Sequence, residues 1–171
     1  MRSFVHIIGR VNEWVGRIAG LLILLVVFII AREVIARGVF HAPSLWADES
    51  MTYIAGFVYV LGGGYALLHR RHVTVDIVYG LFGWRGRRVC DVLAFVLFSA
   101  YCLTLIWFGW DMAMTSLAQG ETSGTLWDPV IWPVKFAIPL GGLLLFLQGI
   151  ANLIQDFSSR PSSPPPPLPN Q

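Results

Sequence analysis

Charged residues are scarce in this 171-residue sequence: they make up 13% of it, while hydrophobic residues make up 56%. Soluble domains usually carry about 25% charged residues, so the composition excludes an ordinary water-exposed globular protein. The net charge of +2 is small, and most acids and bases lie outside the longest apolar stretches, which argues against nucleic acid as a partner. The composition predicts an all-α membrane protein whose core is buried against lipid and neighbouring helices.

Cysteine is also rare, and the motifs of common enzymes are missing. Cys90 and Cys102 are the only cysteines, and their spacing separates them by about 18 Å along one helix, too far for a disulfide within it. The sequence contains no Walker loop, dinucleotide fingerprint, H-E-x-x-H motif or nucleophile elbow. We therefore expect no enzymatic activity, no cofactor and no metal site.

Long apolar runs dominate the sequence instead. A hydrocarbon layer of roughly 30 Å is crossed by about 20 residues of helix. Four segments meet this length, at about residues 14–35, 46–68, 89–110 and 132–154. The first is long for a signal peptide and lacks a clean cleavage site, so we expect it to be retained. The sequence predicts one membrane domain with four transmembrane helices, residues 1–157.

Two further segments cannot span a membrane. The stretch at about residues 73–84, "VTVDIVYGLFGW", is apolar, short and bracketed by arginines, which favours an amphipathic helix in the interface with membrane lipids. An irregular loop is the alternative. Residues 158–171 are rich in proline and serine and predict a disordered tail.

Basic residues are distributed unevenly between the two sides of the predicted bundle. The amino-terminal end carries Arg2, Arg10 and Arg17. The connection after the second span carries five more: Arg70, Arg71, Arg85, Arg87 and Arg88. The opposite side has only the span-end residues Arg32, Arg37 and Lys135. Because positive charge accumulates in cytoplasmic connections, we expect both the N- and C-termini to be cytoplasmic.

Small and amide-bearing residues recur at helical spacing inside the spans. The small residues are Gly16 and Gly20 in the first span, Ala55, Gly62 and Ala66 in the second, and Ala137 and Gly141 in the fourth. Such faces allow close backbone approach. Gln148 and Asn152 carry amides that need hydrogen-bond partners within the bilayer, which favours a protein neighbour over lipid. These faces serve either packing within the chain or docking of a larger membrane partner.

Two other functions compete with that of a subunit in a larger assembly. His69 and His72 could ligate haem in a respiratory membrane anchor, but no second histidine lies at a matching depth on another span. A self-contained small four-helix exporter would need a carboxylate inside the bilayer. Here Glu13 and Glu33 lie at the two ends of the first span, so neither occupies the membrane centre. Each can pair with the arginine four residues later, Arg17 or Arg37.

Two stretches resemble a known transporter family. They are "LWADESMTYIAGFVYVLGGGYALLHRRHVTVDIVYG" and "ETSGTLWDPVIWPVKFAIPLGGLLLFLQGIANLIQD". The matching features are the Trp46 and Glu49 pair, the glycine run at 62–64, His72 and Asp76 in "HVTVD", and the "PxxWPxK" entry to the fourth span. The sequence is similar to the small membrane subunit, the Q component (DctQ-like), of tripartite ATP-independent periplasmic (TRAP) transporters.

This resemblance implies a sodium-coupled importer of organic acids in a cell inner membrane, built from three parts. A periplasmic substrate-binding protein, the P component, would capture the substrate, and a large membrane subunit, the M component, would move it. The small subunit would scaffold the large permease and help dock the binding protein. The resemblance places the sodium and substrate sites in the other subunits.

The polar residues at the expected outer surface allow two interpretations. Trp46 can anchor the second span in the headgroups, while Ser44 caps that helix and the acids in its first turn complement the helix dipole. Alternatively, an acidic platform docks the binding protein, with the carboxylates Asp48, Glu49, Glu121 and Asp128. On the cytoplasmic side, His72 and Asp76 lie four residues apart and predict a structural corner after the second span.

Overall fold

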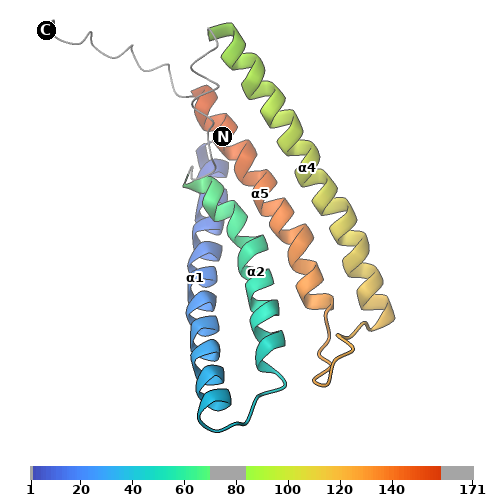
Figure 1. Cartoon of the computed structure of the whole chain (residues 1–171). Helices are drawn as coiled ribbons and strands as arrows, with labels where there is room; N and C mark the ends of the chain where they lie inside the picture. The colour runs from blue at the N-terminus through green and yellow to red at the C-terminus, as the bar shows by residue number, and fades with distance from the viewer. Residues whose placement is uncertain (1, 70–83, 159–171) are drawn as a thin grey trace, which may run out of the picture.

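The computed structural model describes residues 2–69 and 84–158, and four helices account for most of this part of the chain (Figure 1). They are α1 (Arg2–Gly38), α2 (Ala47–Leu68), α4 (Trp84–Gln119) and α5 (Trp132–Ser158). All four are long and apolar enough to cross a membrane. The predicted all-α fold with four spanning helices is confirmed. The predicted interfacial segment, apart from its last residue, and the tail beyond residue 158 lie outside the described residues.

Three helices are longer than the spans expected from membrane thickness, α1 and α4 by the most. α1 begins at Arg2 instead of residue 14, and α4 runs from Trp84 to Gln119 instead of 89 to 110. Bilayer thickness sets how much of a helix must be apolar, but it does not stop a helix. Residues 111–119 contain neither glycine nor proline, so α4 continues until Gly120, which adopts a φ of 59°, a conformation that suits glycine.

The helices form an open layer instead of a closed bundle. α2 packs against α1 and α5, α1 also contacts α5, and α4 packs chiefly against α5. Figure 1 shows α4 on the outer flank of α5, leaning away from α1 and α2. Large apolar side chains consequently remain uncovered on both flanks, as with Phe28 on α1 (70% exposed) and Trp107 on α4 (75% exposed).

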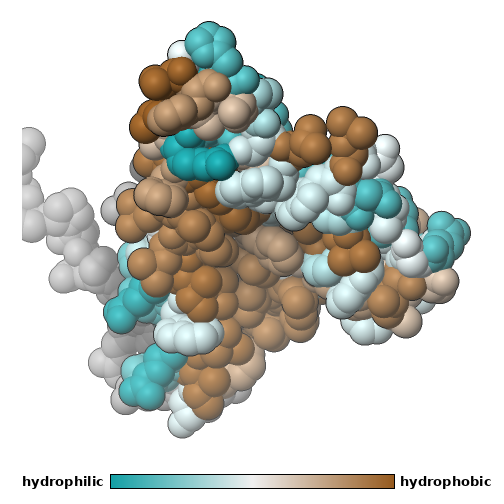
Figure 2. All heavy atoms as spheres, turned by 90° about the horizontal axis from the view of Figure 1, so that it is seen from below, coloured by the Kyte–Doolittle hydropathy of each residue, from teal (hydrophilic) through white to brown (hydrophobic). Residues whose placement is uncertain are grey.

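Large hydrophobic areas are exposed in Figure 2, where the molecule is seen from below and hydrophilic residues form separate groups. Such an area is far larger than water-soluble monomers expose. In a membrane these faces contact lipid or a second membrane protein, because hydrocarbon replaces water around the helices.

Glycines produce the closest helix contacts. A Cβ on Gly141 would lie 2.6 Å from the carbonyl oxygen of Val60, so the backbones of α5 and α2 touch at this point. A Cβ on Gly16 would overlap the ring of Tyr65 and thereby separate α1 from α2. Ala137 is also buried, at 2% exposure. These small residues pack inside the chain, as one of the two sequence interpretations required.

The remaining small residues have a different environment. A Cβ on Gly20 or Gly62 would meet no atom within 4 Å. Tyr59, three residues before Gly62 on α2, is 82% exposed. Ala55 and Ala66, on the same helix, are half-buried. The small-residue pattern therefore divides into positions already occupied within the chain and positions that remain open.

A buried chain of amides connects three helices. Asn12 Nδ2 on α1 donates to Gln148 Oε1 on α5 (3.0 Å), and both side chains are fully buried. Gln148 Nε2 then donates to Asn152 Oδ1 (2.9 Å), and Asn152 Nδ2 donates to the carbonyl oxygen of Leu67 on α2 (3.0 Å). The protein neighbour expected for the Gln148 and Asn152 amides is therefore found within the same chain. Asn12 was missed in the sequence, although its polar side chain lies just before the first apolar run.

We predict measurable coupling between Asn12 and Gln148. Replacing either residue with leucine leaves a buried amide without its partner, whereas replacing both removes the two polar groups together. In thermal or denaturant unfolding of the purified chain, the double-mutant cycle should give a coupling of roughly 0.6–1.7 kcal/mol, as for other hydrogen bonds between membrane helices. Strictly additive losses would contradict the amide chain.

Candidate docking surface at the loop end

The connections α1–α2 and α4–α5 lie at the same end of the molecule, which we call the loop end (Figure 1). All four acids predicted to dock the binding protein lie there. Asp48 and Glu49 occupy the first turn of α2, as expected. Glu121 and Asp128 belong to the connection between α4 and α5.

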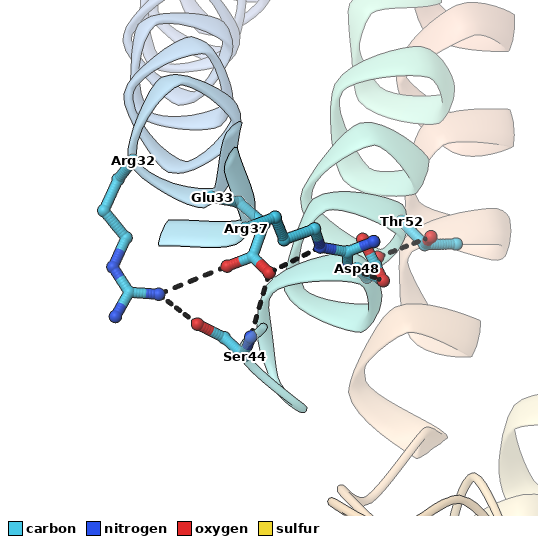
Figure 3. A network of polar contacts seen from close by, with 6 residues as sticks. All are labelled: Arg32, Glu33, Arg37, Ser44, Asp48 and Thr52. Carbon is cyan, nitrogen blue, oxygen red and sulfur yellow. Dashed lines mark hydrogen bonds and ion pairs between the residues drawn. The ribbon is translucent and has the colours of Figure 1, made fainter. Parts of the chain in front are cut away.

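An ionic network closes the corner between α1 and α2 (Figure 3). Glu33, near the end of α1, is only 4% exposed. Its carboxylate accepts hydrogen bonds from Arg37 Nε (2.8 Å), Arg32 Nη1 (3.2 Å) and the backbone N–H of Ser44 (2.9 Å). Three donors therefore satisfy this carboxylate and hold the connecting chain against α1. The i,i+4 pairing of Glu33 with Arg37, expected from the sequence, is confirmed.

The prediction that Ser44 caps α2 was wrong. The N-cap residue is Trp46, which makes no capping side-chain hydrogen bond. Ser44 lies two residues too early, and its hydroxyl instead accepts a hydrogen bond from Arg32 Nη1. The Arg32 guanidinium also lies 5.3 Å from the Trp46 ring centroid, within the range of a cation–π contact. Ser44 and Trp46 thus help to join α2 to the end of α1.

Arg37 extends this network to α2. Its Nη2 lies 2.5 Å from Asp48 Oδ2, while its Nε bonds Glu33. One guanidinium therefore bridges the last turn of α1 and the first turn of α2. Asp48 remains accessible, with 64% of its side chain exposed, but its charge is balanced within the chain.

The connection between α4 and α5 is a hydrogen-bonded hairpin, residues 121–131, which we call the tip hairpin. The N–H of Ser123 donates to Pro129 O (3.0 Å), and the N–H of Ile131 donates to Glu121 O (3.1 Å). At the turn, the N–H of Gly124 donates to Asp128 Oδ1 (2.9 Å). Gly124 and Asp128 both have positive φ, 70° and 49°, and glycine and aspartate are residues that tolerate this conformation.

Two side-chain contacts tie the tip hairpin to the helices. The Ser123 hydroxyl donates to Glu49 Oε2 on α2 (3.2 Å). Lys135 Nζ, in the first turn of α5, donates to Glu121 Oε2. Each of the four predicted docking acids therefore has a polar partner inside the chain. Ser123 could not be identified as a partner of Glu49 from the sequence, because 74 residues separate them.

The Glu121–Lys135 contact predicts a pH dependence. The hydrogen bond from Lys135 holds the pKa of the Glu121 carboxyl below its ordinary value of 4.5. A carboxyl group whose pKa is lower in the folded chain than in the unfolded chain stabilises the fold at pH values above its unfolded pKa. This stabilisation is lost as the pH falls through the folded pKa. The unfolding temperature of the purified chain should drop by about 1–3 °C from this pair as pH falls below 4.5. Glu121→Gln and Lys135→Gln should each remove this part of the drop in unfolding temperature. If both variants showed the same acid-induced drop as the wild type, the Glu121–Lys135 contact would not be its cause.

His69 and Glu13 are described residues at the opposite end of the molecule, and their side chains lie close together. His69 Nδ1 lies 3.2 Å from Tyr65 O, and its Nε2 lies 3.6 Å from Glu13 Oε2. Within residues 2–69 and 84–158, no three histidine, cysteine or acidic side chains gather as a metal site would require. His72 and Asp76, the predicted structural corner, lie outside the described residues.

Four membrane-length helices in an open layer, with a polar loop end, define a multi-pass membrane protein. Comparison with known families is more specific: the family model for the DctQ component of tripartite ATP-independent periplasmic transporters matches residues 26–159. The match covers well over half of the chain, which therefore belongs to this family.

Individual relatives agree with this assignment. The chain is 22% identical to the ectoine TRAP transporter small permease protein TeaB of Halomonas elongata, covering 90% of this chain and 81% of TeaB. It is 26% identical to the isethionate TRAP transporter permease protein DctMQ of Oleidesulfovibrio alaskensis, covering 77% of this chain and 22% of DctMQ. The third relative is the sialic acid TRAP transporter permease protein SiaT of Haemophilus influenzae, at 26% identity over 60% of this chain and 16% of SiaT. The chain thus spans less than a quarter of the last two proteins.

Proposed function

We propose that this chain is the small subunit of a sodium-coupled importer of organic acids in a cell inner membrane. In this proposal it scaffolds a large permease subunit, the M component, and helps dock a periplasmic substrate-binding protein, the P component. The observation that carries the proposal is the open helix layer of a DctQ-family chain. Its uncovered apolar flanks suit a larger membrane partner.

The relatives support a partner of this kind. The name DctMQ denotes a permease protein in which this chain matches only 22% of the length, so most of that protein is available for a second membrane part. By analogy, the present transporter would contain a large membrane part that corresponds to the remainder of DctMQ. Sodium and substrate would bind there.

The open small-residue positions are the best candidates for contact with the large subunit. Gly20 and Gly62 have free space at their Cβ positions, and Ala55 and Ala66 lie on the same helix as Gly62. In contrast, Gly16, Ala137, Gly141 and Gln148 are used within the chain, as is Asn152 through its two hydrogen bonds. We therefore narrow the candidate contact surface to the open positions.

A self-contained exporter is less consistent with the geometry. Such a protein needs a carboxylate that exchanges protons or substrate within the membrane. Glu33 is instead bonded to two arginines and a backbone N–H at the end of α1, and Glu13 pairs with Arg17 at 3.4 Å.

Co-purification tests the proposed assembly. The tagged chain should recover the large subunit in stoichiometric amount from membranes that express the whole transporter. Gly62→Leu should reduce that recovery without lowering the unfolding temperature of the isolated chain, because a Cβ at this position meets no atom of the chain within 4 Å. Recovery of the tagged chain alone, or only as a homodimer, would refute the subunit assignment.

We further predict that the loop end faces the periplasm and that both termini face the cytoplasm, from the distribution of arginine. A single cysteine at Leu126, introduced after replacement of Cys90 and Cys102, should react with a membrane-impermeant maleimide added to intact spheroplasts. A cysteine at Ser3 should react only after the membrane is opened. The reverse pattern would invert the topology.

A further inference from the structure

The tip hairpin presents an apolar side chain that nothing in the fold requires. Leu126, at its turn, is 87% exposed, more than any other large hydrophobic side chain in the described part of the chain. Two further apolar residues of the tip hairpin, Trp127 and Val130, are 44% and 50% exposed. Single exposed apolar residues are common on proteins, so exposure alone does not make this hairpin a binding surface.

Several hydrogen bonds hold the turn that carries Leu126. Besides the ladder from Ser123 to Pro129 O, the N–H of Asp128 donates to Thr125 Oγ1 (3.3 Å), and the Thr125 and Ser123 hydroxyls lie 2.8 Å apart. Ser123 is in turn tied to Glu49 of α2. These hydrogen bonds, on both sides of the turn and to a neighbouring helix, restrict the conformations of the turn before any partner binds. Preorganisation of this kind lowers the entropic cost of binding.

The charges around the turn indicate which partner it fits. Leu126 lies beyond the helix ends at 119 and 132, so it does not face lipid along a spanning helix. Inserting it into the acyl layer would carry the Asp128 carboxylate, two residues away, toward hydrocarbon, where an ionised group loses its hydration. A water-soluble protein can instead provide an apolar pocket for Leu126 and basic side chains opposite the exposed Asp128.

We propose that Leu126, displayed on the tip hairpin, is an apolar anchor for a soluble partner that carries an apolar pocket with a basic rim. This inference rests on the proposed function, in which that partner is the substrate-binding protein. It differs from the acidic platform expected from sequence, because apolar burial supplies the affinity and the acids guide orientation and encounter.

Association of the purified substrate-binding protein with the complete membrane complex in nanodiscs tests the anchor. Leu126→Ser should weaken binding about tenfold, since the buried surface of one leucine side chain is worth at least that factor. The loss should be equal at low and high salt. Leu126→Met, which keeps an apolar side chain of similar volume, should restore most of the affinity.

The matched control is Leu45→Ser, the same change at a 64% exposed leucine of the α1–α2 connection. It should leave binding within about twofold of the wild type, a change under 0.5 kcal/mol. Equal losses for the two variants, or unchanged binding of Leu126→Ser, would overturn the anchor. A photo-crosslinker at position 126 should attach to the binding protein; attachment to lipid alone would also overturn it.

The same preparations separate this inference from the proposed function. If Leu126→Ser complexes retain the large subunit and bind the soluble protein normally, only the anchor fails. If wild-type complexes contain no large subunit, the proposed function fails first, and the anchor fails with it.

Discussion

Replacing Gly141 with alanine is expected to destabilise the chain by about 1–3 kcal/mol, the usual cost of adding atoms to a tightly packed site. The new Cβ would lie 2.5 Å from Val60 Cγ1 and 2.6 Å from Val60 O. A side chain can rotate away, but the carbonyl belongs to the backbone of α2. The added methyl group therefore forces α2 and α5 apart, and the unfolding temperature in detergent should fall.

Gly62→Ala is the matched control for this change. Gly62 lies on α2, one of the two helices concerned, and a Cβ there meets nothing within 4 Å. Alanine should be neutral or stabilise the helix by up to about 1 kcal/mol, through its better helix propensity. If both variants behaved alike, close approach of α2 and α5 at Gly141 would be contradicted.

Glu33→Gln is expected to cause the largest loss of thermal stability among single carboxylate substitutions at the loop end. The carboxylate lies between two guanidinium groups and the backbone N–H of Ser44. Glutamine retains the shape but leaves Arg32 without a carboxylate partner and Arg37 with Asp48 alone. Because the side chain is almost fully covered, water cannot replace the lost contacts, and the α1–α2 corner should loosen.

Glu13→Gln provides the comparison within the same helix. Glu13 also pairs with an arginine four residues later, but at 3.4 Å and with Arg17 72% exposed. Exposed pairs of this type contribute about 0.2–1 kcal/mol. We expect the fall in unfolding temperature for Glu33→Gln to be at least twice that for Glu13→Gln, measured in the same detergent. A larger effect at Glu13 would show that the network around Glu33 is not a main support of the α1–α2 corner.

Local chemistry explains why several features could be predicted. Spans two and four were predicted within one residue of their starts at Ala47 and Trp132, because tryptophan, proline or acidic residues mark the entry into an apolar run. The Glu33–Arg37 pair followed from i,i+4 spacing, which depends only on the helix itself. The helices α1 and α4 extend beyond the expected spans at 14 and 110, because membrane thickness sets the length of the apolar part of a helix and not the residue at which the helix ends.

The polar residues illustrate the opposite case. Ser44 has the correct residue type for an N-cap. Its N–H instead donates to Glu33 and its hydroxyl accepts from Arg32, contacts that form only when the corner between α1 and α2 has folded. Similarly, the amide partners of Gln148 lie on two helices, at positions 12 and 152. Asn12 contacts Gln148 only because α1 packs against α5. The sequence indicated that Gln148 needs a protein neighbour but not which residue it would be.

Composition and apolar run length by themselves determined that this chain is a four-span membrane protein, because the free energy of placing a helix in hydrocarbon is summed over its own residues. Only the tertiary structure decided that the helices form an open layer and that the loop-end acids have partners within the chain. It also decided that Val60 occupies the space beside Gly141 while the space beside Gly62 stays open. These outcomes depend on atoms distant in sequence, whose contacts arise only once the helices have packed.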